Sequence, residues 1–236
     1  MITLPVVNDH DVLVFRVEDV RALRCHGVCA TFMGTLSHYQ QQNVFMLVPM
    51  RLMIWEALWL VHHQIARLVD YKHYRAAHPS TQPSKIDNGS MVIIDDDEAE
   101  ADKELLEQHT ISAQQLAQRF IDAHPQYTPQ RFITEFWNYV HLKDQYQFYI
   151  SPGLKFGGDL VCYPGDPLKY HSYAVVRYAV ANLMDLVVAG RLATLVKKTI
   201  LLIDDDENSQ VDDDGLDRLL EPRTKRTFSI EWAGFG

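Results

Sequence analysis

Three residues in the second half of the chain carry side chains that could break a phosphodiester bond without a metal ion: Tyr163, His171 and Lys198. Tyr163 precedes Pro-Gly-Asp-Pro, a stiff turn that can bring His171 back beside it. Lys198 opens a segment that is typical of a strand. In such chemistry one group removes the proton of a ribose 2′-OH, a second protonates the leaving 5′ oxygen, and a cation stabilises the phosphorane.

Other roles for the same region remain open from the residues alone. Tyrosine and histidine are frequent at sheet edges and lysine often ends a surface strand, so a purely structural role explains all three. Asp159, Asp166 and Lys169 are compatible with a carboxylate-metal nuclease, although an aspartate between turn residues commonly forms the turn itself. The sequence contains neither a GxxxxGK[ST] nor a GxGxxG motif and no zinc-type spacing of Cys and His, so we expect neither a nucleotide-binding loop nor a zinc site.

The acidic residues of this 236-residue chain are concentrated in two segments, although its net charge is −9. Residues 95–107 hold eight acidic residues, residues 204–221 hold nine, and each segment holds one basic residue. The rest of the chain therefore has 14 acidic and 20 basic residues, a net charge of +6. Acidic runs are usually solvated loops, so we expect a mildly basic folded part that is compatible with a polyanionic partner.

The composition, with 47% hydrophobic and 22% charged residues, is typical of a soluble globular protein with a sizeable core. The longest apolar region, 44–61, is interrupted by Arg51 and Glu56, so we expect no membrane insertion. The three cysteines are too few for a disulfide framework, which favours a reducing compartment. We interpret Cys25 and Cys29 as buried thiols.

The order of helix and strand signals predicts an α+β chain made of two units. Residues 1–75 are expected to form a small N-terminal α/β unit, and residues 76–104 an acidic polar linker. Residues 105–236 are expected to form a C-terminal mixed-sheet domain, with an acidic insertion at 204–221.

The sequence predicts the individual elements of both units. In the first unit we expect strands over 12–17 and 44–50 and a helix over 54–66. In the second, a capping box of Ser112 and Gln115 starts a helix, Thr128 before Pro129 starts another, and Asp185 starts a third. The remaining segments are predicted to be strands: 147–150, 159–163, 173–180, 197–203 and 226–232.

Two blocks of the second unit resemble the catalytic core of tRNA-splicing endonucleases: KFGGDLVCYPGDPLKYHS, residues 155–172, and DLVVAGRLATLVKKTILL, residues 185–202. The pattern YPGDPL…H with VAGRL.T.VKKT is similar to the eukaryotic catalytic subunit type that cuts the 3′ splice site. The N-terminal unit, with QNVFMLVPMRLM, resembles the same subunit type more loosely. The resemblance implies a restriction-endonuclease-like catalytic domain. It does not extend to the linker or to the second acidic run.

Carried over by position, the resemblance implies that Tyr163 is the general base, His171 the general acid and Lys198 the stabiliser of the transition state. Lys198 matches the second lysine of KKT, which Lys197 does not. The implied reaction cleaves pre-tRNA at the intron boundary and leaves a 2′,3′-cyclic phosphate and a 5′-hydroxyl, with no cofactor and no metal. Because a free phenol has a pKa of about 10, a nearby cation such as Lys198 is needed to favour the phenolate.

The resemblance also implies partners. Arg191 and Trp232 resemble an arginine and a tryptophan that stack on an RNA base in the partner catalytic subunit's active site. The alternative is that Trp232 packs against the sheet and that Arg191 is a surface residue of its helix with no role in RNA binding. We expect a heterotetramer with a second catalytic subunit and two structural subunits, one of which pairs with the last strands of this chain.

Two rival interpretations remain at this point. A noncatalytic scaffolding or RNA-binding subunit of the same assembly would be expected to lack one or more of Tyr163, His171 and Lys198, and all three are present. A metal-dependent nuclease would be inhibited by EDTA. The resemblance implies a nuclear location, with the cytosolic face of the mitochondrial outer membrane as the alternative.

Overall fold

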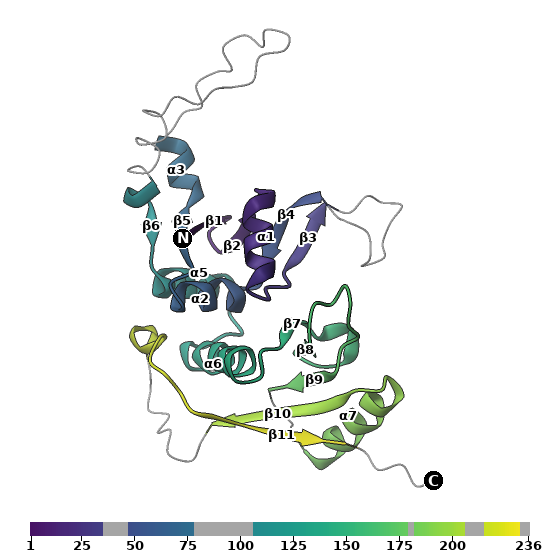
Figure 1. Ribbon diagram of the computed structural model, residues 1–236. Helices are drawn as coiled ribbons and strands as arrows, with labels where there is room; N and C mark the ends of the chain where they lie inside the picture. Colours follow the sequence, from purple (N-terminus) through teal and green to yellow (C-terminus); the bar gives the residue numbers. More distant parts are fainter. Residues whose placement is uncertain (35–46, 78–105, 179–181, 206–214, 232–236) are drawn as a thin grey trace.

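The computed structural model describes residues 1–34, 47–77, 106–178, 182–205 and 215–231. These residues form two mixed β-sheets with helices packed between and beside them (Figure 1). The α+β fold class predicted from the sequence is therefore confirmed. Most of the linker prediction, 76–104, and the middle of the predicted acidic insertion lie outside the described residues, so the division into domains stays a prediction.

The first sheet has six strands in the order β3-β4-β2-β1-β5-β6. Its strands are β1 (Ile2–Val7), β2 (Asp11–Val14), β3 (Thr31–Gly34), β4 (Leu47–Leu52), β5 (Ala66–Asp70) and β6 (Thr110–Ile111). β1 and β5 pair in parallel, whereas β6 pairs antiparallel with β5. The chain thus returns to this sheet after residue 105, before it enters the second sheet.

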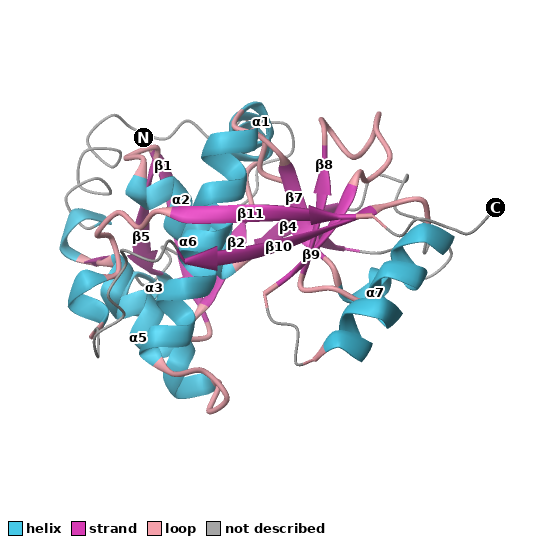
Figure 2. Ribbon diagram, turned by 90° about the horizontal axis from the view of Figure 1, so that it is seen from below, coloured by secondary structure: helices cyan, strands magenta, loops and turns pink. Residues whose placement is uncertain are grey.

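The second sheet has five strands in the order β11-β10-β9-β8-β7. Its strands are β7 (Tyr149–Pro152), β8 (Leu160–Tyr163), β9 (Ala174–Arg177), β10 (Thr199–Asp205) and β11 (Lys225–Ile230). β9 and β10 are parallel and are connected through helix α7 (Leu183–Leu195), while the other pairs are antiparallel. α7 lies beside one end of the β10–β11 pair and α6 (Pro129–Tyr146) beside the other (Figure 2).

One hydrophobic core joins the two sheets through helices α2 (Ile54–His62), α5 (Ala113–Ala123) and α6. The Trp55 ring of α2 lies 4.7 Å from the Phe132 ring of α6 and 6.2 Å from the Phe120 ring of α5, measured between centroids. Aromatic rings of this size bury much apolar surface, so this contact holds the two halves of the chain together. Figure 1 shows the three helices between the sheets.

The helix starts predicted for α5 and α6 are confirmed. The Ser112 Oγ accepts the Gln115 N–H, and the Gln115 side chain accepts the Ser112 N–H. The Thr128 Oγ1 accepts the Arg131 N–H at the start of α6, with Pro129 in the first turn. These local hydrogen bonds satisfy backbone donors that have no partner within the helix.

Several predicted boundaries are wrong. The strand predicted over 12–17 is β2, which ends at Val14. Residue 17 begins helix α1 (Val17–Cys25), whose buried Val20 and Leu23 face the core. α2 ends at His62 because Gln64 adopts a left-handed backbone conformation with φ 57°, which turns the chain into β5. The cap of α7 is Asn182, whose Oδ1 accepts the Asp185 N–H at 3.0 Å, so Asp185 lies in the first turn instead.

The prediction of two buried thiols is half confirmed: Cys29 is buried, whereas Cys25 is exposed at the end of α1. Burial raises the pKa of the Cys29 thiol to about 12. None of the described helices is long and apolar enough to cross a membrane.

Candidate active site

The sheet topology brings the backbones of the three predicted catalytic residues to the same end of the second sheet. β8 is antiparallel to β9 and β9 is parallel to β10, so the end of β8 lies beside the beginnings of β9 and β10. The Tyr173 N–H donates to the Cys162 carbonyl at 2.8 Å, and the Thr199 N–H donates to the Tyr173 carbonyl at 3.1 Å. Tyr163, His171 and Lys198 flank these bonded positions.

Lys198 is placed by the end of helix α7. The Lys198 N–H donates to the Ala193 carbonyl at 2.9 Å, and the Lys197 N–H donates to the Thr194 carbonyl at 3.1 Å. Lys197 itself has φ 55°, so the pair forms a helix-ending Schellman motif with a lysine in the left-handed position. The motif turns the chain sharply and places Lys198, not Lys197, directly before Thr199, the first residue of β10.

The Lys198 side chain reaches the segment next to His171. Its Nζ donates to the Ser172 carbonyl at 3.3 Å and lies 4.8 Å from the centroid of the Phe156 ring, in the short η1 helix (Leu154–Phe156). Partial burial lowers the pKa of this ammonium group. The arrangement holds a cation beside the Ser172–Tyr173 peptide, close in sequence to His171, and Phe156 is a contact that the sequence did not single out.

The loop between Tyr163 and His171 is a compact turn built on Asp166. The Asp166 Oδ1 accepts the Leu168 N–H at 2.9 Å. The backbone carbonyl of Asp166 accepts the N–H groups of Lys169 and Tyr170 at 2.8 and 3.0 Å. A Cβ atom at Gly165 would lie 2.7 Å from the Tyr170 ring, so only glycine fits there without movement. The interpretation of Asp166 as a turn former is confirmed.

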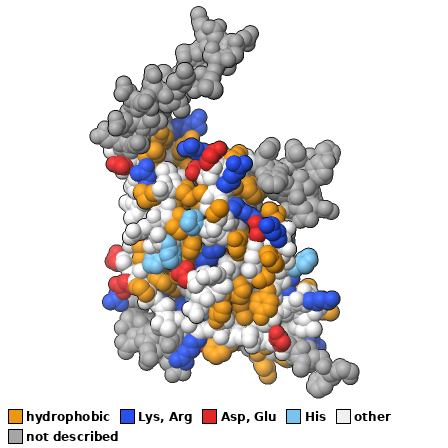
Figure 3. Space-filling model, in the orientation of Figure 1, with side chains coloured by type: hydrophobic (Ala, Val, Ile, Leu, Met, Phe, Trp, Pro, Cys, Tyr) orange, Lys and Arg blue, Asp and Glu red, His pale blue; other side chains and the backbone are white. Residues whose placement is uncertain are grey.

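The three side chains differ in exposure. Tyr163 and Lys198 are partly buried, and His171 is exposed. Large apolar side chains are also exposed on this loop: Leu168 is 60% and Tyr170 is 53% exposed. Figure 3 shows hydrophobic side chains gathered on the lower half of the molecule, over the region of β8 and β9. The loop at this end of the sheet is therefore exposed to solvent.

The base-clamp residues are placed only in part. Arg191 is exposed on α7 and takes part in contacts with the rest of the chain. Trp232 lies outside the described residues. Among the described residues, no group of three or more His, Cys, Asp and Glu is arranged to hold a metal ion. The clamp and the absence of a metal stay predictions.

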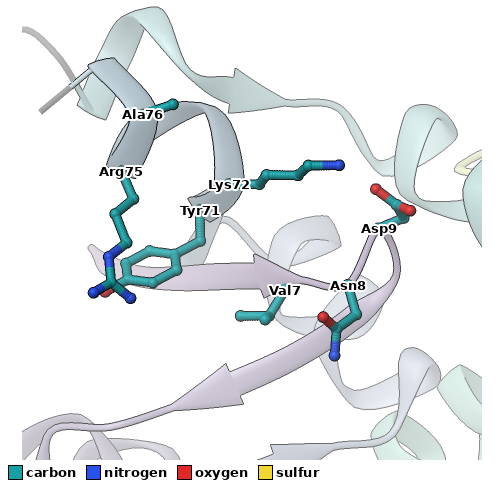
Figure 4. A pocket seen from close by; sticks show the side chains of 7 residues that line it. All are labelled: Val7, Asn8, Asp9, Tyr71, Lys72, Arg75 and Ala76. Carbon is teal, nitrogen blue, oxygen red and sulfur yellow. The ribbon is translucent and has the colours of Figure 1, made fainter. Parts of the chain in front are cut away.

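A second surface feature lies away from this end of the sheet. A hollow of about 590 Å³ opens between the β1–β2 turn and helix α3 (Tyr71–Ala77), and all its lining residues come from the N-terminal unit (Figure 4). Its lining residues are Val7, Asn8, Asp9, Tyr71, Lys72, Arg75 and Ala76. Figure 4 shows the Lys72 side chain extending toward Asp9.

A buried carboxyl group lies in the junction between the two units. Glu56 of α2 is fully buried and accepts the N–H groups of Cys29, Ala30 and Met53 at 3.0, 2.9 and 2.8 Å. Burial raises the pKa of Glu56 from 4.5 to about 7, against the lowering effect of these hydrogen bonds. The folded chain therefore binds a proton at Glu56 more tightly than the unfolded chain does.

We expect this proton to make stability depend on pH. The contribution of Glu56 to stability is fully present below about pH 4.5 and is lost as the pH rises toward 7. The free energy of unfolding, compared with that of the Glu56→Gln variant, should fall by up to about 3 kcal/mol over this range. Chemical denaturation of both proteins at several pH values measures the difference; two parallel pH profiles would contradict the assignment.

Comparisons with known proteins agree with this organisation. Residues 2–71 match the family model "TSEN34-like, N-terminal domain", and residues 132–212 match the model "tRNA intron endonuclease, catalytic C-terminal domain". The second match contains the end of β8 and the beginnings of β9 and β10.

Individual relatives cover nearly the whole chain. The tRNA-splicing endonuclease subunit SEN34 of Saccharomyces cerevisiae is 27% identical, over 95% of this chain and 99% of its own length. The probable tRNA-splicing endonuclease subunit sen34 of Schizosaccharomyces pombe is 29% identical, over 95% of both chains. The mouse tRNA-splicing endonuclease subunit Sen34 is 49% identical over 59 residues, 23% of this chain and 19% of its own. The chain thus combines a segment similar to the TSEN34-like N-terminal domain with a segment similar to the catalytic domain of tRNA intron endonucleases.

Proposed function

We propose that this chain is a catalytic subunit of a tRNA-splicing endonuclease and cleaves intron-containing pre-tRNA at the 3′ splice site. The observation that supports this most is the shared position of Tyr163, His171 and Lys198 at one end of the second sheet, inside the region that matches the catalytic domain. The names of the matched relatives, which are tRNA-splicing endonuclease subunits, support the same substrate.

In the proposed reaction Tyr163 takes the proton of the ribose 2′-OH, whose oxygen then attacks the adjacent phosphorus. His171 gives a proton to the 5′ oxygen as the phosphorus–oxygen bond breaks, so the products are a 2′,3′-cyclic phosphate and a 5′-hydroxyl. Lys198 stabilises the extra negative charge on the phosphorane. The exposed position of His171 leaves it accessible to a leaving group on a large RNA.

The chain is proposed to act within an assembly that also contains a second catalytic subunit and two structural subunits. β11 is the edge strand of the second sheet, and its Phe228 is 53% exposed. An edge strand with unpaired backbone groups is a site for strand addition, which supports pairing with a structural subunit there. Arg191, with Trp232, is proposed to grip a base in the other catalytic site, and the complex is expected in the nucleus.

The test is reconstitution. Co-expression with the three expected partners should give a complex that cuts intron-containing pre-tRNA at the 3′ junction at an unchanged rate in excess EDTA, because no step requires a metal ion. Mapping of the RNA ends should find a 2′,3′-cyclic phosphate and a 5′-hydroxyl. Activity that EDTA abolishes and Mg²⁺ restores would favour a metal-dependent nuclease, and a complex without 3′ cleavage would favour a scaffolding subunit.

A further inference from the structure

The loop that separates Tyr163 from His171 is held by a residue from the other end of the chain. Arg24, in the last turn of α1, places its Nη2 2.5 Å from the Asp166 Oδ1. The two residues are 142 positions apart in the sequence, and their side chains are 21% and 30% exposed. This ion pair therefore connects the N-terminal unit directly to the candidate active site.

The pair is better shielded from solvent than an ordinary surface salt bridge, which usually contributes little to stability. Burial alone would raise the pKa of Asp166, but the Leu168 N–H and the Arg24 guanidinium outweigh it, so this pKa is lowered. The same Oδ1 accepts the Leu168 N–H that closes the turn. Arg24 thus binds the one side chain on which the loop is built.

Arg24 is also hydrogen-bonded to the segment that follows α1, residues 26–30: its Nη1 donates to the Cys29 carbonyl at 3.5 Å. The Gly27 carbonyl accepts a hydrogen bond from the buried Lys143 Nζ at 2.6 Å, and Val28 forms a bridge to Ile150 of β7. The N–H groups of Cys29 and Ala30 are bound by Glu56, as described above. A rigid support at one end of the ion pair and an exposed loop at the other means that the N-terminal unit restrains the loop.

We propose that Arg24 is a positioning residue for RNA cleavage: its ion pair with Asp166 orients the loop so that Tyr163 and His171 face the same phosphodiester. The inference rests on the proposed function, and it gives the N-terminal unit a role in the chemical step. Misplacement of reacting groups by about 1 Å costs on the order of 10²-fold in rate. Arg24 is proposed to touch no substrate and to act only through Asp166.

The test uses the assembled complex with Arg24→Gln in this chain. Single-turnover cleavage at saturating enzyme should slow on the order of 10- to 10²-fold at the 3′ junction. The dissociation constant for pre-tRNA and the rate at the 5′ junction should stay within about twofold, a split that general damage to the fold would not produce. Arg24→Lys, which keeps the charge, should recover part of the rate.

Three further variants keep the result interpretable. Asp166→Asn retains an oxygen for the Leu168 N–H but removes the charge, so it should slow the 3′ step as Arg24→Gln does. The double variant should be no slower than either single one, because both remove the same interaction. Arg21→Gln, the same change at an exposed position of α1, is the matched control and should cut at the wild-type rate.

Wild-type 3′ cleavage by both Arg24→Gln and Asp166→Asn complexes would overturn this proposal and leave the proposed function standing. Equal slowing at both junctions, or weaker binding of pre-tRNA as the only change, would overturn it as well. A wild-type complex that does not cut at the 3′ junction would instead remove the proposed function, and this inference with it.

Discussion

In the assembled complex, His171→Ala is expected to abolish cleavage at the 3′ junction while cleavage at the 5′ junction continues. The imidazole is the proposed donor of the proton to the leaving 5′ oxygen, and loss of a general acid costs about 10²- to 10⁴-fold. The side chain is exposed on a loop, so its removal should change the free energy of unfolding by no more than about 0.5 kcal/mol. Single-turnover rates at the two junctions, measured on the same pre-tRNA, separate the effects.

Lys169→Ala provides the control for this loop, because Lys169 is an exposed charged residue two positions before His171. It should leave both rates near those of the wild type. A His171→Ala complex that loses both junctions equally would reject the assignment of His171 to one scissile bond.

The second large effect is expected from Lys198→Met, which keeps the length of the side chain and removes its charge. Loss of one group that stabilises a developing charge costs about 10²- to 10³-fold, and the loss should fall on 3′ cleavage. The Nζ of Lys198 is fixed against the Ser172 carbonyl and the Phe156 ring, so a longer guanidinium in Lys198→Arg should restore only part of the rate. Single-turnover cleavage with saturating complex measures the rates of the wild type, Lys198→Met and Lys198→Arg.

Lys197→Met is the matched control. It removes the same charge from the adjacent residue, Lys197. The Lys197 side chain is exposed, its backbone is left-handed, and it lies one position farther than Lys198 from the start of β10. A loss of 3′ cleavage in Lys197→Met with normal cleavage in Lys198→Met would show that the second lysine of KKT was the wrong choice.

The parts of the fold that depend on local chemistry could be predicted from the sequence. The caps at Ser112 and Thr128 are hydrogen bonds within four residues, and both formed as expected. Boundaries that depend on packing were harder: the predicted strand over 12–17 gives way to α1, and α7 begins at Leu183, ahead of Asp185. Neither change has a turn residue such as Gly or Pro to mark it.

The candidate site was predictable as a set of residues but not as an arrangement. The turn at Asp166 follows from its own local hydrogen bonds, which are typical of aspartate between prolines. Its partner Arg24 lies in helix α1, which connects two strands of the first sheet. No periodicity or motif in the sequence relates Arg24 to Asp166. The buried Glu56 was likewise hidden, because a single acid in an apolar helix gives no sign of the three backbone N–H groups that it binds.

The proposed reaction requires His171 and Lys198 to act together with Tyr163 on one phosphodiester. The most direct measurement is a double-mutant cycle: single-turnover rates at the 3′ junction for complexes with His171→Ala, Lys198→Met and both changes. Groups that act as a unit give a double variant little slower than the slower single variant, and this is the predicted result. Losses that simply multiply, or that appear equally at the 5′ junction, would contradict a shared site.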